Sequence, residues 1–236
     1  MISTVKPYEG SGSGLTEYAY QLTAHMKPLL LKRDSLELLY ALDQAKRTNI
    51  AGLIKSNTSF KRKVAMIPKD GYDIIHILDH EVGFAAKILK KTGNNARVIT
   101  TIHDLSRLEK GLHRGVAQKV YNKLVKGSIA DAVKYSDFIL CNSSQTYATL
   151  QERFGRHENV KTVLHGTGDR MISAPIPKNK RIGAFTVGYI GALVKHKNVA
   201  FMLETAKLLK DKNYRFIIYG TGADMKLLLK FKDACA

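Results

Sequence analysis

The chain has 236 residues, which is long for one compact domain and short for two complete ones. Hydrophobic residues make up 44% and charged residues 25%, so we expect a folded protein with a sizeable core and not a disordered chain. The 38 Lys and Arg residues outnumber the 20 Asp and Glu residues, and the formal net charge of +18 favours anionic partners without choosing among phosphates, nucleic acid and acidic membranes.

Short β-branched or apolar runs alternate along the chain with longer stretches whose apolar residues recur at a spacing of three and four. After a first strand near the N-terminus, the predicted strands are Ile74–Leu78, Val98–Ile102, Phe138–Cys141, Val160–Leu164, Phe185–Ile190 and Phe216–Tyr219. The predicted helices are Leu15–Leu31, Phe84–Lys91, Val116–Lys134, Gln145–Phe154, Val199–Leu209 and Met225–Phe231. This alternation predicts an α/β fold with parallel sheets and helices on both faces.

A linker is predicted at Met171–Lys180, where two prolines interrupt both helix and sheet. We place the domain boundary near Ser173, with an N-terminal domain of residues 1–172 and a second domain of residues 173–236. Only two strands and two helices are predicted after the boundary, which is too few to close a doubly wound domain. The second domain is therefore expected to be partial.

Targeting and redox signals favour a cytoplasmic protein. The N-terminus lacks the plan of a signal peptide, and no apolar run approaches the roughly 18 residues that a spanning helix needs. Cys141 and Cys235 stand in no CxxC or Cys/His spacing, which argues against a disulfide framework and a zinc site. Any membrane contact is expected to be peripheral, at the inner face. No nucleic-acid partner is expected, because RNP and zinc-finger patterns are absent.

A glycine run, Glu9–Gly14, follows the first strand and opens a helix. Glycines such as Gly12 and Gly14 let backbone N–H groups approach a phosphate or a sugar closely. The spacing departs from the dinucleotide pattern G-x-G-x-x-G, and a flexible turn without a ligand explains the run equally well.

Two strands end in a histidine, His76 in the first and His103 in the second. Loops at the carboxyl edge of an open α/β sheet are where ligands bind. His103 is the better candidate because it directly follows its strand and precedes Asp104, which could orient the imidazole or face solvent. A hydrogen-bonded histidine without a functional role remains an equal alternative.

The second domain repeats this arrangement with a basic loop. The strand that ends at Ile190 leads through Gly191 into a turn with Lys197, just before a helix, which suits a diphosphate. Gly220 and Gly222 follow the next strand and allow close backbone approach to a ligand. The alternative for an isolated lysine is a solvated surface position.

Seven motifs, taken in order, resemble the landmarks of GT-B glycosyltransferases of family 4. They are GSGSG, DIIHILDH, VITTIHD, FILCNSSQT, VKTVLHGTGD, VGYIGALVKHKN and FIIYGTG, and together they span nearly the whole chain. The resemblance implies two facing Rossmann-like domains and a nucleotide sugar held mainly by the second. It also implies retaining transfer to a glycan or lipid-linked acceptor, with no cofactor and no required metal.

The resemblance implies roles for single residues. His103 looks like the active-site histidine near the transferred sugar, and Gly12 and Gly14 look like the glycine loop. Lys197 matches the lysine that neutralises the donor diphosphate. The donor-side turns carry Gly191, Gly220 and Gly222, the last two of which match the turn beside the nucleotide.

Two departures from the family pattern weaken the donor site. Ala192 stands where the family usually has arginine, and Lys195 or His196 would have to substitute for it. The chain ends at Ala236, before the family's paired glutamates that hold the ribose and the sugar. We therefore expect no turnover of a nucleotide sugar by this chain alone. The alternative function is a catalytically silent sugar- or lipid-binding relative.

A basic amphipathic stretch, Arg107–Lys134, interleaves lysines and arginine with leucines and valines. Such a stretch is often a membrane-surface element, so an anionic membrane surface is a candidate partner. The alternative is a solvated face over an ordinary core helix.

Overall fold

The computed structural model describes residues 1–8, 14–42, 50–105, 116–166, 185–210, 212–226 and 229. The chain divides into two compact units, Met1–Ile172 and Ser173–Ala236, and each is described here by itself. The second unit begins at Ser173, near which the sequence places the domain boundary, and the predicted linker Met171–Lys180 lies outside the described residues apart from this division. The same is true of the glycine run up to position 13 and of most of the predicted final helix.

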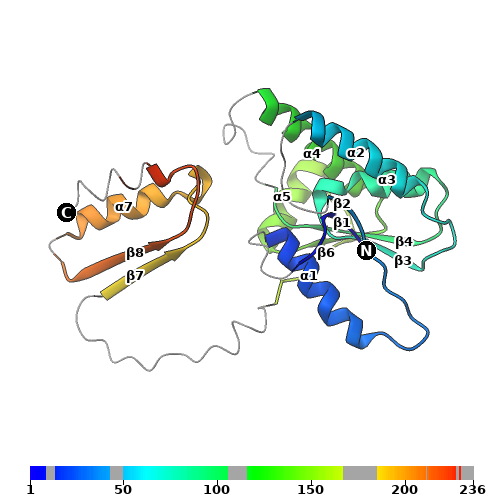
Figure 1. Cartoon of the computed structure of the whole chain (residues 1–236), viewed down its shortest axis with the longest axis horizontal. Helices are drawn as coiled ribbons and strands as arrows, with labels where there is room; N and C mark the ends of the chain where they lie inside the picture. The colour runs from blue at the N-terminus through cyan, green and yellow to red at the C-terminus, as the bar shows by residue number, and fades with distance from the viewer. Residues whose placement is uncertain are drawn as a thin grey trace. The chain divides into compact units, whose positions relative to one another are not determined.

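The first unit contains a six-stranded parallel sheet in the order β2-β1-β3-β4-β5-β6 (Figure 1). Its strands are β1 (Ile2–Val5), β2 (Leu39–Leu42), β3 (Ile74–Ile77), β4 (Arg97–Ile102), β5 (Phe138–Cys141) and β6 (Val160–Thr162). The chain runs outward from β1 to β2 and then returns to β3 on the other side of β1. This reversal of strand order makes the carboxyl edge of the sheet the expected place for a ligand.

Helices cover both faces of this sheet. They are α1 (Gly14–Met26), η1 (Lys27–Leu29), α2 (Ile50–Ala65), η2 (His80–Val82), α3 (Phe84–Lys91), α4 (Val116–Tyr135) and α5 (Ser144–Phe154). In Figure 1, α2, α3 and α4 lie on one face and α1 lies on the opposite face. Along β4, Val98 and Ile102 pack toward α2, α3 and α4, whereas Thr101 contacts Tyr18 of α1. Because side chains alternate along a strand, the residue after Ile102 also belongs to the α1 face.

Most predicted elements are present with ends shifted by a few residues. The helix predicted as Leu15–Leu31 ends earlier, at Met26, and Pro28 lies in the tighter η1 turn that follows. Proline lacks the backbone N–H that a continuing α-helix needs, which is consistent with this change. The sequence analysis missed β2 and α2 completely.

The packing of α3 on α4 depends on a close approach at Gly83, the residue before α3. A Cβ atom at Gly83 would lie 2.7 Å from the carbonyl oxygen of Ser128 and 2.9 Å from the Cβ of Ala132. The Ser128 hydroxyl also accepts from the N–H of Phe84 (3.0 Å) and donates to the carbonyl of Glu81 (3.0 Å). These contacts bind the loop after β3 to the middle of α4.

We expect Gly83→Ala to lower the free energy of unfolding by about 1–3 kcal/mol, because the added methyl group meets backbone and must push the helices apart. Gly127→Ala is the matched control, since Gly127 is inside α4 and no described atom outside the backbone of that helix lies within 4 Å of a Cβ there. It should raise the free energy of unfolding by about 0.5–1 kcal/mol through helix propensity. Denaturant unfolding of both variants measures the difference, and equal effects would contradict the close packing.

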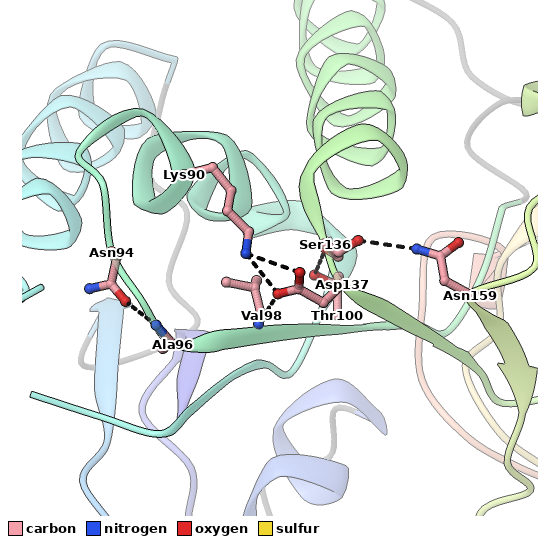
Figure 2. A network of polar contacts seen from close by, with 8 residues as sticks. All are labelled: Lys90, Asn94, Ala96, Val98, Thr100, Ser136, Asp137 and Asn159. Atoms are coloured by element: carbon pink, nitrogen blue, oxygen red, sulfur yellow. Dashed lines mark hydrogen bonds and ion pairs between the residues drawn. The ribbon is translucent and has the colours of Figure 1, made fainter. Parts of the chain in front are cut away.

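A polar network fixes the start of β4 between α3, the end of α4 and β6 (Figure 2). The Asp137 carboxylate accepts from Lys90 Nζ (2.8 and 3.1 Å) and from the backbone N–H of Val98 (2.7 Å). On the preceding residue, the Ser136 hydroxyl bonds the Thr100 hydroxyl at 2.8 Å, and the Ser136 carbonyl accepts from the Asn159 amide at 3.1 Å. The strand that ends beside His103 is thus anchored at its other end.

Asp137 makes the stability of this unit depend on pH. Burial alone would raise the pKa of the Asp137 carboxyl, but hydrogen bonds from Lys90 and Val98 and the Lys90 charge outweigh it, so the pKa is lowered. A carboxyl with a lowered pKa in the folded state contributes stability above its unfolded value of 3.8, and this is lost as the pH falls through the folded value.

We expect Asp137→Asn to cost about 1–2 kcal/mol at pH 7, a value reduced for the partial exposure of the pair. The difference from wild type should shrink as the pH falls below the unfolded value of 3.8 toward the lowered pKa of the folded carboxyl. Asp131→Asn is the control, because Asp131 of α4 also pairs with a lysine of α3, Lys87, at 3.0 Å. No backbone N–H is among the described donors to Asp131, so its effect should be smaller. Urea unfolding from pH 3 to 7 tests this, and a difference that does not change with pH would refute it.

The second unit contains two parallel strands, β7 (Phe185–Ile190) and β8 (Tyr214–Tyr219), in register from end to end. The η4 turn (Lys195–Lys197) leads into α7 (Val199–Leu208), which covers one face of this pair. Leu193 and Val199 are buried there, with Tyr189, Leu203 and Ile218 packed around them. This strand-turn-helix-strand arrangement presents the loops after both strands at one edge.

Candidate functional site

A cluster of aromatic and polar side chains occupies the α1 side of the sheet at its carboxyl edge. We name it the histidine cluster, and its members are Tyr18, His76, Thr101, His103 and His165. His76 lies in β3, Thr101 lies in β4, and His103 follows β4 directly. Tyr18 comes from α1, and His165 follows β6. Elements far apart in the sequence therefore meet at the edge where the sheet topology predicts a ligand site.

The imidazole of His103 has a defined tautomer. Its Nε2 lies 2.7 Å from the carbonyl oxygen of Leu78, and because a carbonyl only accepts, Nε2 must carry the proton. Burial lowers the pKa of His103 to about 4; the Leu78 hydrogen bond and Asp104 act in the opposite direction, while His165 and His80 add to the lowering. At pH 7 the ring is neutral and its Nδ1 is a hydrogen-bond acceptor. Nδ1 can therefore accept a hydrogen bond from a hydroxyl group of a ligand.

The Leu78 carbonyl is held in place by a capped turn. The Asp79 carboxylate accepts from the N–H of Thr4 (2.8 Å), the Thr4 hydroxyl (2.7 Å) and the N–H of Glu81 (3.0 Å). Asp79 is buried, and burial raises its pKa while the Thr4 bonds act the other way. Asp79 thereby ties the end of β1 to the end of β3, at the point where the strand order reverses.

A hydrogen-bonded chain runs behind His103. The Tyr18 hydroxyl lies 3.3 Å from Thr101 Oγ1, which lies 2.8 Å from His76 Nε2. Burial lowers the pKa of His76 to about 4 and raises the pKa of Tyr18. Both groups are therefore neutral at pH 7, and the chain holds Tyr18 in one orientation.

The sequence left open whether Asp104 orients the imidazole of His103 or faces solvent. Asp104 is exposed, and the carbonyl of Leu78 orients the imidazole of His103. His76, predicted to end its strand, lies instead inside β3, which continues to Ile77; it belongs to the same cluster and contacts Thr101. The prediction for His103 itself concerns a ligand and stays a prediction.

Sequence reasoning missed Tyr18 and His165 as site residues. His165 appeared only within the motif VKTVLHGTGD, and Tyr18 appeared only inside a predicted helix. The available signal for His165 was its place just after a strand, as for His103. Tyr18 stands one turn into the helix that the glycine run opens, which was the signal for that residue.

The predicted glycine loop is only partly described. Gly12 lies outside the described residues, and Gly14 is the first residue of α1. No described atom lies within 4 Å of where a Cβ of Gly14 would be, so packing does not require glycine there. A role for Gly14 in binding stays a prediction.

The predicted donor residues come together in the second unit. A Cβ at Gly220 would collide with the carbonyl oxygen of Gly191, and a Cβ at Gly222 would collide with the backbone of Leu193. The N–H of Gly191 bonds the Tyr219 carbonyl at 3.0 Å, closing the two loops on each other. Packing alone thus explains why Gly220 and Gly222 are glycines, and their role toward a nucleotide stays a prediction.

Lys197 ends the η4 turn and is exposed. The next residue, Asn198, adopts a left-handed conformation (φ 49°) and its N–H bonds the carbonyl of Lys195. This tight turn sets Lys197 two residues before Val199, the first residue of α7, where backbone N–H groups favour an anion. The side chain of His196 lies outside the described residues.

Two further observations concern metals and membranes. The described part of the chain contains no group of three or more His, Cys, Asp or Glu side chains placed to hold a metal ion. None of its helices combines the length and the apolar composition that crossing a bilayer requires. Independence from metal stays a prediction.

One family model matches the chain, and several solved structures share its fold. The family model described as Glycosyltransferase Family 4 matches residues 36–167, which is more than half of the chain. No curated protein sequence matches. The solved structures similar to it include the lipopolysaccharide outer core galactosyltransferase WaaB in its apo form, with 14% identity and a TM-score of 0.58 over 99% of this chain.

Two other solved structures are similar. The Anabaena protein Alr3699/HepE, solved with UDP and glucose, has 14% identity and a TM-score of 0.54 over 98% of this chain. The OtsA apo structure has 12% identity and a TM-score of 0.58 over 99% of this chain. The chain spans 64% of the length of WaaB and of HepE and 68% of OtsA. With the family match and this shared α/β fold, the chain belongs to glycosyltransferase family 4 and has the Rossmann-like fold of the GT-B enzymes.

Proposed function

We propose that the chain forms the acceptor-side domain and the opening part of the donor-side domain of a retaining glycosyltransferase. The enzyme moves a sugar from a nucleotide-sugar donor to a glycan or a lipid-linked acceptor. The observation that carries this proposal is the neutral His103, whose Nδ1 is an acceptor at the carboxyl edge of a family 4 sheet. The presence of UDP and glucose in the HepE structure supports a nucleotide sugar as the donor.

The proposed chemistry needs a cation for the leaving group and an acceptor for a sugar hydroxyl. Departure of a diphosphate from an oxocarbenium-like sugar is the barrier, so fixed positive charge near the leaving group lowers it most. Lys197 supplies that charge at the start of α7. His103 accepts a hydrogen bond from a hydroxyl of the transferred sugar and orients it. The reaction retains the anomeric configuration and requires no metal.

A binding panel tests this function with the full chain. Thermal shift and calorimetry with UDP-glucose, UDP-galactose, UDP-N-acetylglucosamine and GDP-mannose should identify at least one donor that raises the melting temperature. The effect should fall in His103→Ala and Lys197→Ala. Binding without donor hydrolysis or transfer, in the longest in-frame form of the enzyme as well, would favour the catalytically silent sugar- or lipid-binding relative. Failure of every donor to bind would contradict the proposal.

We also propose that α4 contacts an anionic membrane surface, where a lipid-linked acceptor would reside. Lys119, Lys123 and Lys126 are exposed on α4, and Val120 and Leu124 each remain 44% exposed between them. An exposed helix face with lysines around apolar side chains suits an interfacial helix. The part of the predicted basic stretch before Val116 lies outside the described residues.

We expect replacing these three lysines with glutamine to weaken binding to anionic phospholipid vesicles roughly tenfold or more, since each lysine near such a surface contributes about 1 kcal/mol. The control replaces Lys161, Lys210 and Lys212 with glutamine. These lysines are exposed and lie outside α4, so the control removes the same amount of charge. Co-sedimentation of the wild type should also fall steeply with salt. No binding at low salt would end the membrane proposal.

A further inference from the structure

Three rings from three separate elements touch one another in the histidine cluster. The Tyr18 ring stacks on His165 with centroids 4.4 Å apart and an interplanar angle of 19°. The same ring meets His103 edge to face at 4.6 Å and 74°. His103 and His165 are 5.1 Å apart, so the tyrosine is shared by two imidazoles that also contact each other.

Among the described residues, the ring of His165 is held by its contacts with the Tyr18 and His103 rings. His165 is an exposed residue of the loop after β6, and neither of its ring nitrogens has a hydrogen-bond partner among the described residues. Partial burial lowers the pKa of His165, so the ring is neutral at pH 7. Stacking on Tyr18 orients the imidazole and leaves both nitrogens for a ligand. A neutral imidazole bonds a hydroxyl group and gives no charge to a phosphate.

Tyr18 is itself fixed from behind. Its hydroxyl contacts Thr101 Oγ1, which in turn contacts His76 Nε2. The tyrosine therefore cannot rotate freely, and the two imidazoles that it touches have a fixed spacing. His103 presents Nδ1 as an acceptor, and His165 can either donate or accept. This pair matches adjacent hydroxyls of a pyranose, each of which can donate and accept.

We propose that His165 binds the saccharide of the donor together with His103, and that Tyr18 is the positioning residue that sets the spacing of the two imidazoles. The proposal rests on the proposed function, because it assigns a further sugar contact to the same site. It differs from a purely structural role, in which His165 only shields Tyr18 from water.

Variants that keep or remove the ring separate these two roles. His165→Phe keeps the stacked ring and removes both nitrogens, whereas His165→Ala removes the stack as well. Tyr18→Phe keeps the stack and removes only the hydroxyl, whereas Tyr18→Leu removes the shared ring. His25→Phe is the control, because His25 lies exposed in the last turn of α1.

The experiment measures two affinities of the full chain by calorimetry. One is for the donor that binds the wild type most tightly in the panel of three UDP-sugars and GDP-mannose, and the other is for UDP or GDP alone. We expect His165→Phe to lower the affinity for the nucleotide sugar about 3–10-fold, the effect of one lost hydrogen bond. Its affinity for the nucleoside diphosphate should be unchanged. Tyr18→Leu should lower the nucleotide-sugar affinity at least as much, and Tyr18→Phe should retain most of it. His25→Phe should match the wild type.

The thermodynamic coupling of the two residues gives a readout that loss of folding would not produce. If Tyr18 acts through the imidazoles, the losses in Tyr18→Leu and His165→Phe should be less than additive in the double variant. Unchanged nucleotide-sugar affinity in His165→Phe, with a clear loss in His103→Ala, would overturn this inference and leave the proposed function intact. If no donor binds the wild type, the proposed function fails and this inference fails with it.

Discussion

Replacing His103 with alanine is expected to lower nucleotide-sugar turnover about 10²-fold or more, the scale of removing one positioned polar group from an active site. The neutral ring offers its Nδ1 lone pair because Nε2 donates to the carbonyl of Leu78. Alanine removes that acceptor from the carboxyl edge of the sheet. The measurement is kcat and kcat/KM with saturating acceptor in the longest in-frame form of the enzyme.

The fold should survive this substitution nearly unchanged. His103 is only partly buried, and its Leu78 hydrogen bond is worth about 1 kcal/mol, so the melting temperature should fall by only a few degrees. His25→Ala serves as the control, since His25 is an exposed histidine at the end of α1. Turnover of the His103→Ala variant at the wild-type level would return His103 to a hydrogen-bonded residue without a catalytic role.

The fold could be predicted from the sequence wherever local pattern and tertiary packing agree. Phe84–Lys91, Phe138–Cys141 and Phe185–Ile190 have the predicted bounds, because each is an apolar run or stripe that packs on one layer. The fold class followed from their alternation. The same argument fails where an element has a weak local signal.

Helix α2 illustrates that failure. Its sequence includes Gly52, Asn57 and Thr58, which are poor helix formers. Phe60 and Val64 are nonetheless fully buried in the core against β3 and α3, and this packing outweighs the local preference. Strand β2 has only four residues and is partly buried along its whole length, so it shows no alternation to detect.

The candidate site divides in the same way. His103 could be predicted because a strand, a histidine and a chain direction suffice to place it at the carboxyl edge. Tyr18 and His165 could not, because their contact joins a helix near the N-terminus to a loop after the last strand of the sheet. For Gly220 and Gly222, the sequence pattern suggested contact with a ligand. The structure shows that close backbone packing also requires glycine at both positions, and this packing could not be read from the sequence.

In the longest in-frame form of the enzyme, replacing Lys197 with alanine is expected to lower turnover by about 10²–10³-fold, as for the removal of one preorganised group from a developing charge. The lysine is exposed at the end of a tight turn before α7, so its charge can reach a diphosphate without a burial cost. Affinity for UDP or GDP should fall as well, because the same charge attracts the bound diphosphate. Lys197→Arg should recover part of both, since the cation is kept.

Two lysine variants decide whether the effect belongs to this position. Lys212→Ala removes an exposed charge before β8 and should leave turnover and diphosphate affinity unchanged. Lys195→Ala tests the neighbouring lysine of the same turn, because Ala192 leaves the donor site without the arginine that the family usually has. If Lys195→Ala lowers diphosphate affinity as much as Lys197→Ala, the two lysines share the charge. If Lys197→Ala changes neither turnover nor affinity, the cation that assists departure of the diphosphate is not Lys197, and the assignment carried by the resemblance is wrong.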